Sequence, residues 1–152
     1  MHYRLYKPED FEALYAIEEA CFVPPFTFGR RYMRWLVSAP NAATWIAEDL
    51  QAMAGFAIVE WTPATNGIGA YIQTIEVAPG YRGQGVGRML LQCVESSARE
   101  AIAQVLWLHV EDANTTAIRL YESSGFSPAG NAEDYYAPGR HALIYRKDAG
   151  LT

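Results

Sequence analysis

The sequence has few of the features that mark secreted, membrane or metal-binding proteins. It contains only two cysteines, Cys21 and Cys93, too few and too far apart for a zinc site or a disulfide framework. No apolar run approaches the length of a membrane span, and the polar start MHYRLYKPED does not resemble a secretory signal. We therefore expect a cytoplasmic protein that holds no metal and has no membrane partner.

Charge is also sparse and unbalanced. Charged residues make up 19% of the chain, and the formal net charge is -5. This acidity argues against a nucleic-acid partner and favours basic or amine-bearing partners. Apolar residues make up 51% of the 152 positions, which is enough to bury the core of one domain spanning residues 1–152.

Hydrophobic periodicity predicts helices mixed with strands. Helical spacing favours helices over 8–22, 30–39, 86–102 and between the N-cap Asn114 and the stop Gly125. Strands are predicted over 2–7, 43–49, 54–61, 70–78, 105–110 and 141–147, with a turn at 62–69. The run at 105–110 is nearly all apolar, as in a strand covered on both faces. This order predicts a layered α/β domain with a mostly antiparallel sheet.

One turn between a strand and a helix is unusually rich in glycine. The stretch VAPGYRGQGVGRML, residues 77–90, contains four glycines and two arginines, Arg82 and Arg88. Backbone N–H groups at such a turn, together with the positive end of the following helix dipole, suit a phosphate. A tight turn without a ligand is the structural alternative. The spacing matches neither a nucleoside-triphosphate loop nor a full dinucleotide-binding fingerprint.

The glycine turn resembles the acetyl-CoA loop of the GNAT acetyltransferases, whose pattern is Arg/Gln-x-x-Gly-x-Gly/Ala. Arg82, Gly85 and Gly87 match that pattern. The later stretch NTTAIRLYESSGF resembles the second signature of the family. Its matching residues are Asn114, Ala117, Tyr121, Gly125 and Phe126.

The resemblance implies the GNAT fold, a single three-layer α/β domain whose mixed, mostly antiparallel sheet splays between strands 4 and 5. It also implies acetyl-CoA as co-substrate, with Asn114 at the pantetheine arm and Tyr121 near the thiol. The other implied CoA-binding residues are Val77, Arg82, Gly83, Gln84, Gly85, Val86, Gly87 and Arg88. Packing on its own helix is the alternative role for Tyr121.

Transfer of an acetyl group to an amine requires that the ammonium lose a proton and that the departing thiolate be protonated. Strand alternation predicts that Tyr71, Gln73, Ile75 and Val77 share one face. His109 lies in an otherwise apolar strand, and its ordinary pKa suits a base near neutral pH. A core histidine bonded to the backbone is the alternative.

Within the family, the sequence resembles the N-terminal peptide acetyltransferases. Tyr71 and His109 match the catalytic Tyr and His of one eukaryotic branch, which act through water, and Tyr121 would be the acid. The similar ribosomal-protein-alanine acetyltransferases carry Glu where His109 stands. That departure suggests that His109 replaces the Glu as base.

Substrate-binding residues are also implied by this resemblance. Tyr135 and Tyr136, expected in a loop before the last strand, would bond the peptide backbone, and Gln73 shares the predicted face of Tyr71. Phe22 and Phe26 belong to a loop that would wall the pocket of the first residue. Ordinary aromatic packing is the alternative for both groups, and the 22–28 loop is one residue longer than its usual form.

These observations favour an acyltransferase that moves the acetyl group of acetyl-CoA to the N-terminal α-amine of a peptide or protein, by direct attack in a ternary complex. A second enzyme hypothesis is a small-amine acetyltransferase acting on a polyamine or amino sugar. A third hypothesis is an acyl-CoA-binding module without turnover, which the presence of His109 and Tyr121 opposes.

Overall fold

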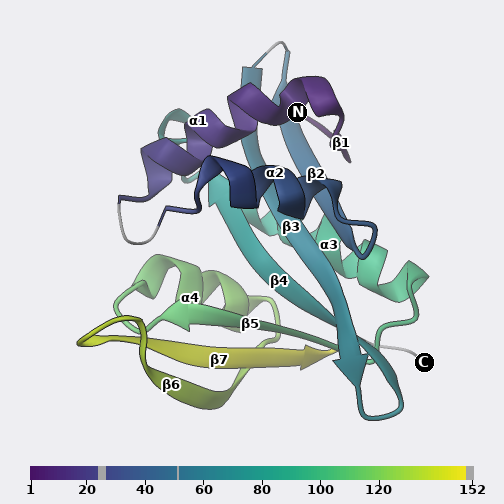
Figure 1. Cartoon of the computed structure of the whole chain (residues 1–152), viewed down its shortest axis with the longest axis vertical. Helices are drawn as coiled ribbons and strands as arrows, with labels where there is room; N and C mark the ends of the chain where they lie inside the picture. Colours follow the sequence, from purple (N-terminus) through teal and green to yellow (C-terminus); the bar gives the residue numbers. More distant parts are fainter. Residues whose placement is uncertain (24–26, 51, 150–152) are drawn as a thin grey trace.

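The structure is a computed structural model that describes residues 1–23, 27–50 and 52–149. It consists of one seven-stranded sheet with helices on both faces (Figure 1). The helices are α1 (Phe11–Cys21), α2 (Arg30–Ser38), α3 (Val86–Glu100) and α4 (Thr115–Ser123), with short 3-10 helices η1 (Pro8–Asp10) and η2 (Pro79–Tyr81). The strands are β1 (His2–Leu5), β2 (Ala42–Asp49), β3 (Ala52–Ala64), β4 (Gly67–Val77), β5 (Val105–Glu111), β6 (Ser127–Ala137) and β7 (Arg140–Asp148).

The sheet is mixed and mostly antiparallel. Its strand order is β1-β2-β3-β4-β5-β7-β6, and β4 and β5 are the parallel neighbours. These two strands pair only at Ala70–Leu106 and Tyr71–Trp107, after which they diverge (Figure 1). The predicted α/β domain with a splay between the fourth and fifth strands is therefore confirmed.

Two apolar clusters hold the layers together. One cluster packs α1 and α2 on one face of β2 and β3, around Phe11, Leu14, Met33 and Phe56. The other packs α3 and α4 on the opposite face and includes Leu90 and Tyr121. None of the helices in the described part of the chain is long and apolar enough to cross a membrane.

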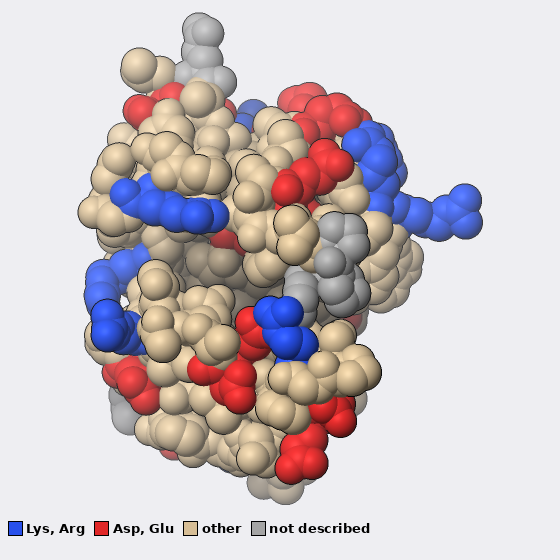
Figure 2. Space-filling model, turned by 90° about the vertical axis from the view of Figure 1, so that its left-hand side faces the viewer, with Lys and Arg blue, Asp and Glu red and all other residues tan. Residues whose placement is uncertain are grey.

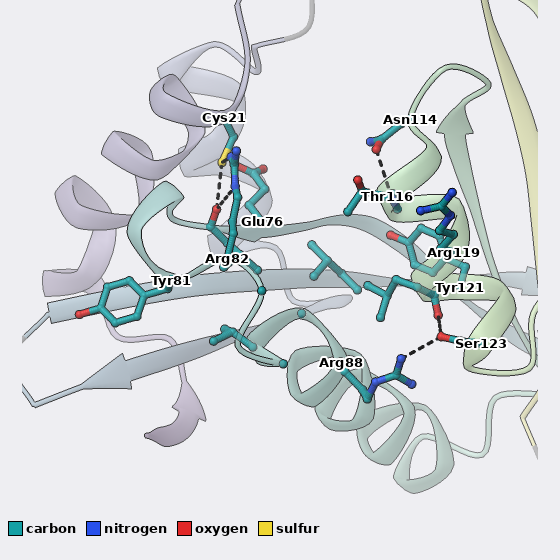
Figure 3. A pocket seen from close by; sticks show the side chains of 18 of the residues that line it. Cys21, Glu76, Tyr81, Arg82, Arg88, Asn114, Thr116, Arg119, Tyr121 and Ser123 are labelled. Atoms are coloured by element: carbon teal, nitrogen blue, oxygen red, sulfur yellow. Dashed lines mark hydrogen bonds between the residues drawn. The ribbon is translucent and has the colours of Figure 1, made fainter.

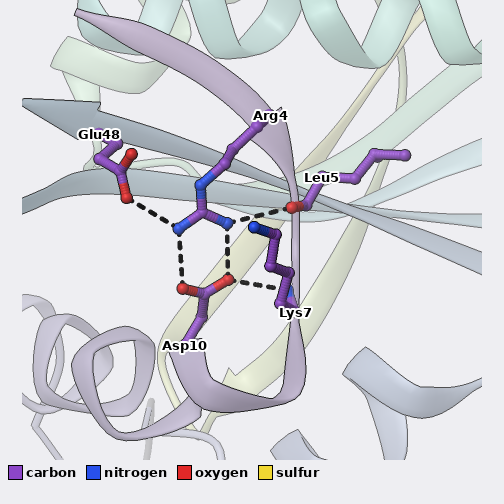
Figure 4. Close-up of polar contacts among 5 residues, drawn as sticks. All are labelled: Arg4, Leu5, Lys7, Asp10 and Glu48. Carbon is purple, nitrogen blue, oxygen red and sulfur yellow. Dashed lines mark hydrogen bonds and ion pairs between the residues drawn. The ribbon is translucent and has the colours of Figure 1, made fainter.

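An ion-pair network ties the first strand to the body of the sheet (Figure 4). The guanidinium of Arg4 donates to both carboxylate oxygens of Asp10, at 2.8 and 2.9 Å, and to Glu48 of β2 at 2.9 Å. The Lys7 N–H also donates to Asp10. Asp10 is nearly buried, and both of its carboxylate oxygens accept hydrogen bonds, as a buried charged group requires.

Several predicted boundaries are corrected by the structure. The predicted turn at 62–69 is shorter, because β3 continues to Ala64 and β4 begins at Gly67. The helix predicted to reach 102 ends at Glu100, and Ile102 is 70% exposed with a φ of 58°. Strand β5 is buried on one face only, since residues 106, 108 and 110 are buried while 107 and 109 are partly exposed.

A β-bulge in β4 overturns the predicted alternation. Ile58 of β3 pairs with Thr74 and Val59 pairs with Ile72, so Gln73 has no partner in the register. Cross-strand partners share a face, so the bulge moves the later side chains to opposite faces from those expected. Tyr71 therefore does not share a face with Ile75 and Val77, which pack against the cluster under α3.

Candidate active site

A groove of about 800 Å³ follows the glycine turn between α3 and α4 (Figure 3). Gly83 and Gly85 have φ values of +76° and +83°, a region that side chains rarely adopt, and added Cβ atoms would point into open space. The surface is hollowed in the middle, with Lys and Arg side chains above and below one end of the hollow (Figure 2). The predicted CoA-binding residues that line the groove are Val77, Arg82, Gly83, Gly85, Val86, Gly87, Arg88 and Asn114.

The turn has the features of a phosphate-binding site. Gly85 is the N-cap of α3 and makes no side-chain cap, so the first N–H groups of the helix have no partner within it. The helix dipole adds positive potential at the same point. Open backbone at two glycines, unpartnered helix N–H groups and nearby guanidinium groups together fit the phosphates of a CoA molecule.

The arginines of the groove have different partners. Arg82 folds back, so that its Nε donates to the Val77 carbonyl at 3.2 Å and its Nη2 to the sulfur of Cys21 at 3.3 Å. Arg88 of α3 reaches across to α4 and donates to the Ser123 hydroxyl at 2.9 Å. Arg119 of α4 also lines the groove, although the sequence analysis did not identify it. The sequence could have indicated Arg119, because Thr116, Arg119 and Ser123 are spaced so that they lie on one face of a helix, and all three line the groove.

The side chains of two predicted CoA-binding residues form hydrogen bonds with nearby backbone groups. Gln84 donates to the Gly80 carbonyl at 3.4 Å and does not line the groove. Asn114 caps α4 by accepting the Ala117 N–H at 3.2 Å, as the sequence predicted for the helix start. Asn114 nevertheless lines the groove, where its amide N–H₂ group is available to a ligand.

A second pocket of about 690 Å³ joins the groove through a shared wall. It opens between α1, α2, the bulged part of β4, β5 and β6. The two cavities share six lining residues: Cys21, Phe22, Ile75, Asn114, Ala117 and Tyr121. An acyl donor in the groove and an acceptor in the pocket would therefore meet at this wall, where β4 and β5 diverge.

Tyr71 and His109 meet in this second pocket. The Tyr71 hydroxyl lies 2.8 Å from Nδ1 of His109, across the gap between β4 and β5. The imidazole also stacks on Tyr135, with ring centroids 4.1 Å apart and planes 9° from parallel. Burial lowers the pKa of His109, so the ring is neutral and able to accept a proton at neutral pH. Burial raises the pKa of Tyr71, so its hydroxyl keeps its proton.

Tyr121 lies in the wall between the two cavities. It is 7% exposed, and its ring makes an edge contact with Phe126 at 5.6 Å. Burial, and to a lesser degree the neighbouring Tyr136, raise the pKa of Tyr121. Its phenol is therefore protonated at neutral pH.

The predicted substrate residues are placed as follows. Tyr135 and Tyr136 line the pocket but belong to β6 rather than to a loop, because the hairpin with β7 turns later, at 138–139. Gln73 lines the pocket and donates to Glu60 at 3.1 Å. Phe22 lines both cavities, and Phe26 lies outside the described residues.

Other pocket residues were not found from the sequence. Phe28 and Tyr32 line the pocket from the side of α2, and Glu18 of α1 lies at its base. The signal for Glu18 was present, because position 18 follows Phe11, Leu14 and Tyr15 at the i, i+3, i+4, i+7 spacing of the buried face of α1, but the sequence analysis did not identify it. Among the residues that the structure describes, no three His, Cys, Asp or Glu side chains are grouped to hold a metal ion.

Comparison with known proteins agrees with this geometry. Residues 11–126 match the model of the Acetyltransferase (GNAT) family. The chain is 32% identical to the [ribosomal protein bS18]-alanine N-acetyltransferase of Escherichia coli K12 over 134 residues, which cover 84% of this chain and 81% of that protein. The crystal structure of the ribosomal-protein-S18-alanine N-acetyltransferase from Escherichia coli superposes with a TM-score of 0.85 at 26% identity, covering 99% and 95% of the two chains.

A second relative has a different acceptor in its name. The chain is 40% identical to streptothricin acetyltransferase of Streptomyces lavendulae over 95 residues. That match covers 60% of this chain and only 49% of the relative, so it spans about half of the longer protein. The family match covers most of the domain and includes both signature stretches, and the chain therefore belongs to the GNAT family of acetyltransferases.

Proposed function

We propose that this acetyltransferase acts on the N-terminal α-amine of a peptide or protein, by direct attack in a ternary complex with acetyl-CoA. The observation that carries the proposal is the Tyr71–His109 contact at 2.8 Å, stacked on Tyr135 in the pocket that joins the cofactor groove. A base, an acid and two connected cavities are the parts that direct transfer requires.

His109 is the proposed base, acting together with Tyr71. An incoming ammonium is mostly protonated at neutral pH and must lose a proton before attack. The Tyr71 hydroxyl can take that proton as it passes its own to Nδ1 of His109, which is neutral because burial lowers its pKa. The contact between the two side chains is direct, so this relay needs no water between them.

Tyr121 is the proposed acid. Acetyl-CoA supplies the acetyl group as a thioester, from which the sulfur departs as a thiolate. Tyr121 stands in the wall shared by the groove and the pocket, and its raised pKa keeps the hydroxyl protonated until then. The residues proposed to hold CoA are those of the glycine turn, together with Asn114, Arg88 and Arg119.

The shape of the pocket supports a peptide acceptor. Tyr135 and Tyr136 of β6 form one part of the wall, with ring centroids 5.0 Å apart and planes at 90°, and Phe28 and Tyr32 form another part. Aromatic walls and hydroxyl groups of this kind can hold an extended backbone between them. The likeness to bS18-alanine acetyltransferases over most of the chain supports the same acceptor class.

A small cationic amine is the second candidate. The 40% identity with streptothricin acetyltransferase and the net charge of -5 favour it. The match extends over only 60% of the chain, whereas the peptide-acetyltransferase match extends over 84%. We therefore rank the peptide first.

A panel of acceptors separates the two candidates. Peptides that begin with Met, Ala, Ser or Thr, and small amines such as a polyamine, an amino sugar and streptothricin, would be compared by thiol release. We expect the highest kcat/KM with a peptide, and loss of that rate when its α-amine is blocked. Faster turnover of a small amine than of every peptide would overturn the peptide assignment.

A further inference from the structure

Two carboxyl groups are buried together beneath the junction of the two cavities. Glu18 of α1 is 0% exposed and Glu76 of β4 is 2% exposed. Glu18 lies at the base of the acceptor pocket, and Glu76 borders the cofactor groove beside Cys21 (Figure 3). Burying two ionised carboxylates side by side costs free energy, and this cost falls when one of them holds a proton.

The hydrogen bonds of the pair are accounted for if it holds one proton. One oxygen of Glu18 accepts the Phe28 N–H at 2.9 Å, and one oxygen of Glu76 accepts the Thr74 hydroxyl at 2.8 Å. The remaining Oε1 atom of each carboxyl group has no conventional donor in the described part of the chain. Burial, followed by the neighbouring Glu18 carboxyl group, raises the pKa of Glu76, so a protonated Glu76 could donate to Glu18 and fill both vacant positions.

Glu18 helps to hold Phe28 in place, and Phe28 forms part of the wall of the acceptor pocket. Glu18 accepts the N–H of Phe28, and the Tyr15 hydroxyl donates to the carbonyl of Phe28 at 2.8 Å. Both backbone groups of Phe28 are thus bound by side chains of α1. The Phe28 ring in turn contacts Tyr32 at 5.3 Å, and both rings line the pocket.

The surroundings of the pair are mostly apolar. Phe56 and Ile58 of β3 pair with Glu76 and Thr74 and bring no charge. The titratable and charged groups that act on this region are the Cys21 thiol at the end of α1 and the Arg82 guanidinium of the glycine turn. Neither makes a direct ion pair with the two carboxyl groups among the contacts of the described residues.

We propose that Glu18 and Glu76 are positioning residues for the acceptor, which share one proton and so tie Phe28 to the bulged part of β4 that carries Tyr71. The tie fixes one wall of the pocket relative to the Tyr71–His109 pair. This inference rests on the proposed function, because it takes the second pocket to be the acceptor site.

Steady-state kinetics of Glu18 variants test the tie. Glu18→Ala removes the partner of the Phe28 N–H, so the acceptor KM should rise roughly tenfold, the size of one hydrogen bond to a charged group. The KM for acetyl-CoA should change less than twofold. Glu18→Gln should recover most of the loss, because its amide oxygen can accept from Phe28 while its N–H₂ donates to Glu76.

Glu19→Ala is the matched control, since it removes an exposed acid from the next position of the same helix. Its acceptor KM should match that of wild type. If Glu18→Ala raises both KM values equally, or leaves the acceptor KM at the level of Glu19→Ala, the pair only fills the core and the proposal is wrong.

A pH series tests the shared proton. Glu76→Gln keeps a donor toward Glu18 and an acceptor for Thr74 without needing a proton. The acceptor KM of wild type should therefore rise more steeply between pH 8 and 10 than that of Glu76→Gln, with amine ionisation common to both. Parallel pH profiles would show that no shared proton is involved.

Hydrogen exchange gives a readout that does not need turnover. A peptide containing the Phe28 amide should exchange at least several-fold faster in Glu18→Ala than in Glu19→Ala. If the wild type acetylates no peptide but this difference is present, the proposed function fails and the tie stands. If peptides are acetylated but exchange is equal, the tie fails and the function stands.

Discussion

At the scale of single residues, His109 is the group whose replacement should change the chemistry most. A general base usually supplies about a hundred- to ten-thousand-fold in rate, so His109→Ala should lower kcat by roughly that factor. CoA affinity should stay near that of wild type, since His109 lines the acceptor pocket and not the groove. Initial-rate assays of thiol release measure the change in kcat, and calorimetry with CoA measures the affinity.

The activity of wild type and of His109→Ala should also depend differently on pH. Burial lowers the pKa of His109, so the neutral base persists below the ordinary titration range of histidine. The kcat/KM of wild type should fall as the pH drops through this lowered pKa, and this part of the acidic limb should disappear in His109→Ala, while the part due to ionisation of the acceptor amine is common to both. His109→Glu should restore part of the rate. A variant with the rate and pH profile of wild type would make the histidine structural.

Tyr121 is expected to affect turnover without affecting binding. Its hydroxyl would act only as the thiolate leaves, so Tyr121→Phe should lower kcat by about a hundredfold or more while both KM values stay within about twofold. The phenyl ring keeps the packing on Phe126, which separates chemistry from stability. Equal kcat values for the variant and wild type would reduce Tyr121 to a packing residue.

At the scale of elements, the glycine turn should bind CoA partly through charge. Arg82→Ala should weaken CoA binding, because it removes a cation from the groove and the contact that holds the Val77 carbonyl. The difference from wild type should shrink as salt screens the phosphates. Calorimetry at two ionic strengths measures this, with Arg99→Ala at the far end of α3 as control. Equal affinities for Arg82→Ala and wild type would place the phosphates elsewhere.

The Arg4 network should make stability depend on pH at the acidic end. The hydrogen bonds from Arg4 lower the pKa of Asp10 below its ordinary value near 4. A depressed pKa contributes stability above the unfolded value and loses it as the pH falls through the folded value. Asp10→Asn should therefore cost about 2 kcal/mol at pH 7 and progressively less below pH 4, as measured by denaturant unfolding.

An exposed ion pair provides the comparison for Asp10. Glu12 pairs with Arg30 and Arg34, but its side chain is 69% exposed, so Glu12→Gln should change stability by well under 1 kcal/mol. A loss in Asp10→Asn no larger than that of Glu12→Gln, or one that is constant from pH 7 to 3, would mean that the network contributes nothing measurable.

The sequence pattern predicts the order of the elements but not the irregularities within a strand. Periodicity predicted the order of helices and strands, since it follows directly from which residues are apolar. It could not predict the bulge at Gln73, because a one-residue insertion leaves the local pattern intact and is fixed by pairing with β3. Tyr135 and Tyr136 were expected in a loop because Pro138 and Gly139 follow closely and mark a turn, but pairing with β7 extends β6 to Ala137.

At the scale of the whole molecule, the site depends on two halves of the sheet that diverge. β1 to β4 carry Tyr71 and the glycine turn, while β5 to β7 carry His109 and Tyr135 (Figure 1). Residues 71 and 109 are 38 positions apart, and no local pattern brings them together. Their proximity was expected from the resemblance to peptide acetyltransferases, and the parallel pairing of β4 with β5 is what places them 2.8 Å apart.

Because the groove lies between these halves, acetyl-CoA should stabilise the whole fold. A ligand that binds only the folded chain at one hundred times its Kd adds about 2.7 kcal/mol to the free energy of unfolding. For a chain of 152 residues this corresponds to a rise in Tm of about 5–10 °C, measurable by calorimetry or fluorescence. Arg82→Ala should show a smaller rise at the same ligand concentration, and His109→Ala the full rise. A Tm that is unchanged by saturating acetyl-CoA would contradict binding across the splay, because a ligand that contacts both halves cannot leave their unfolding unaffected.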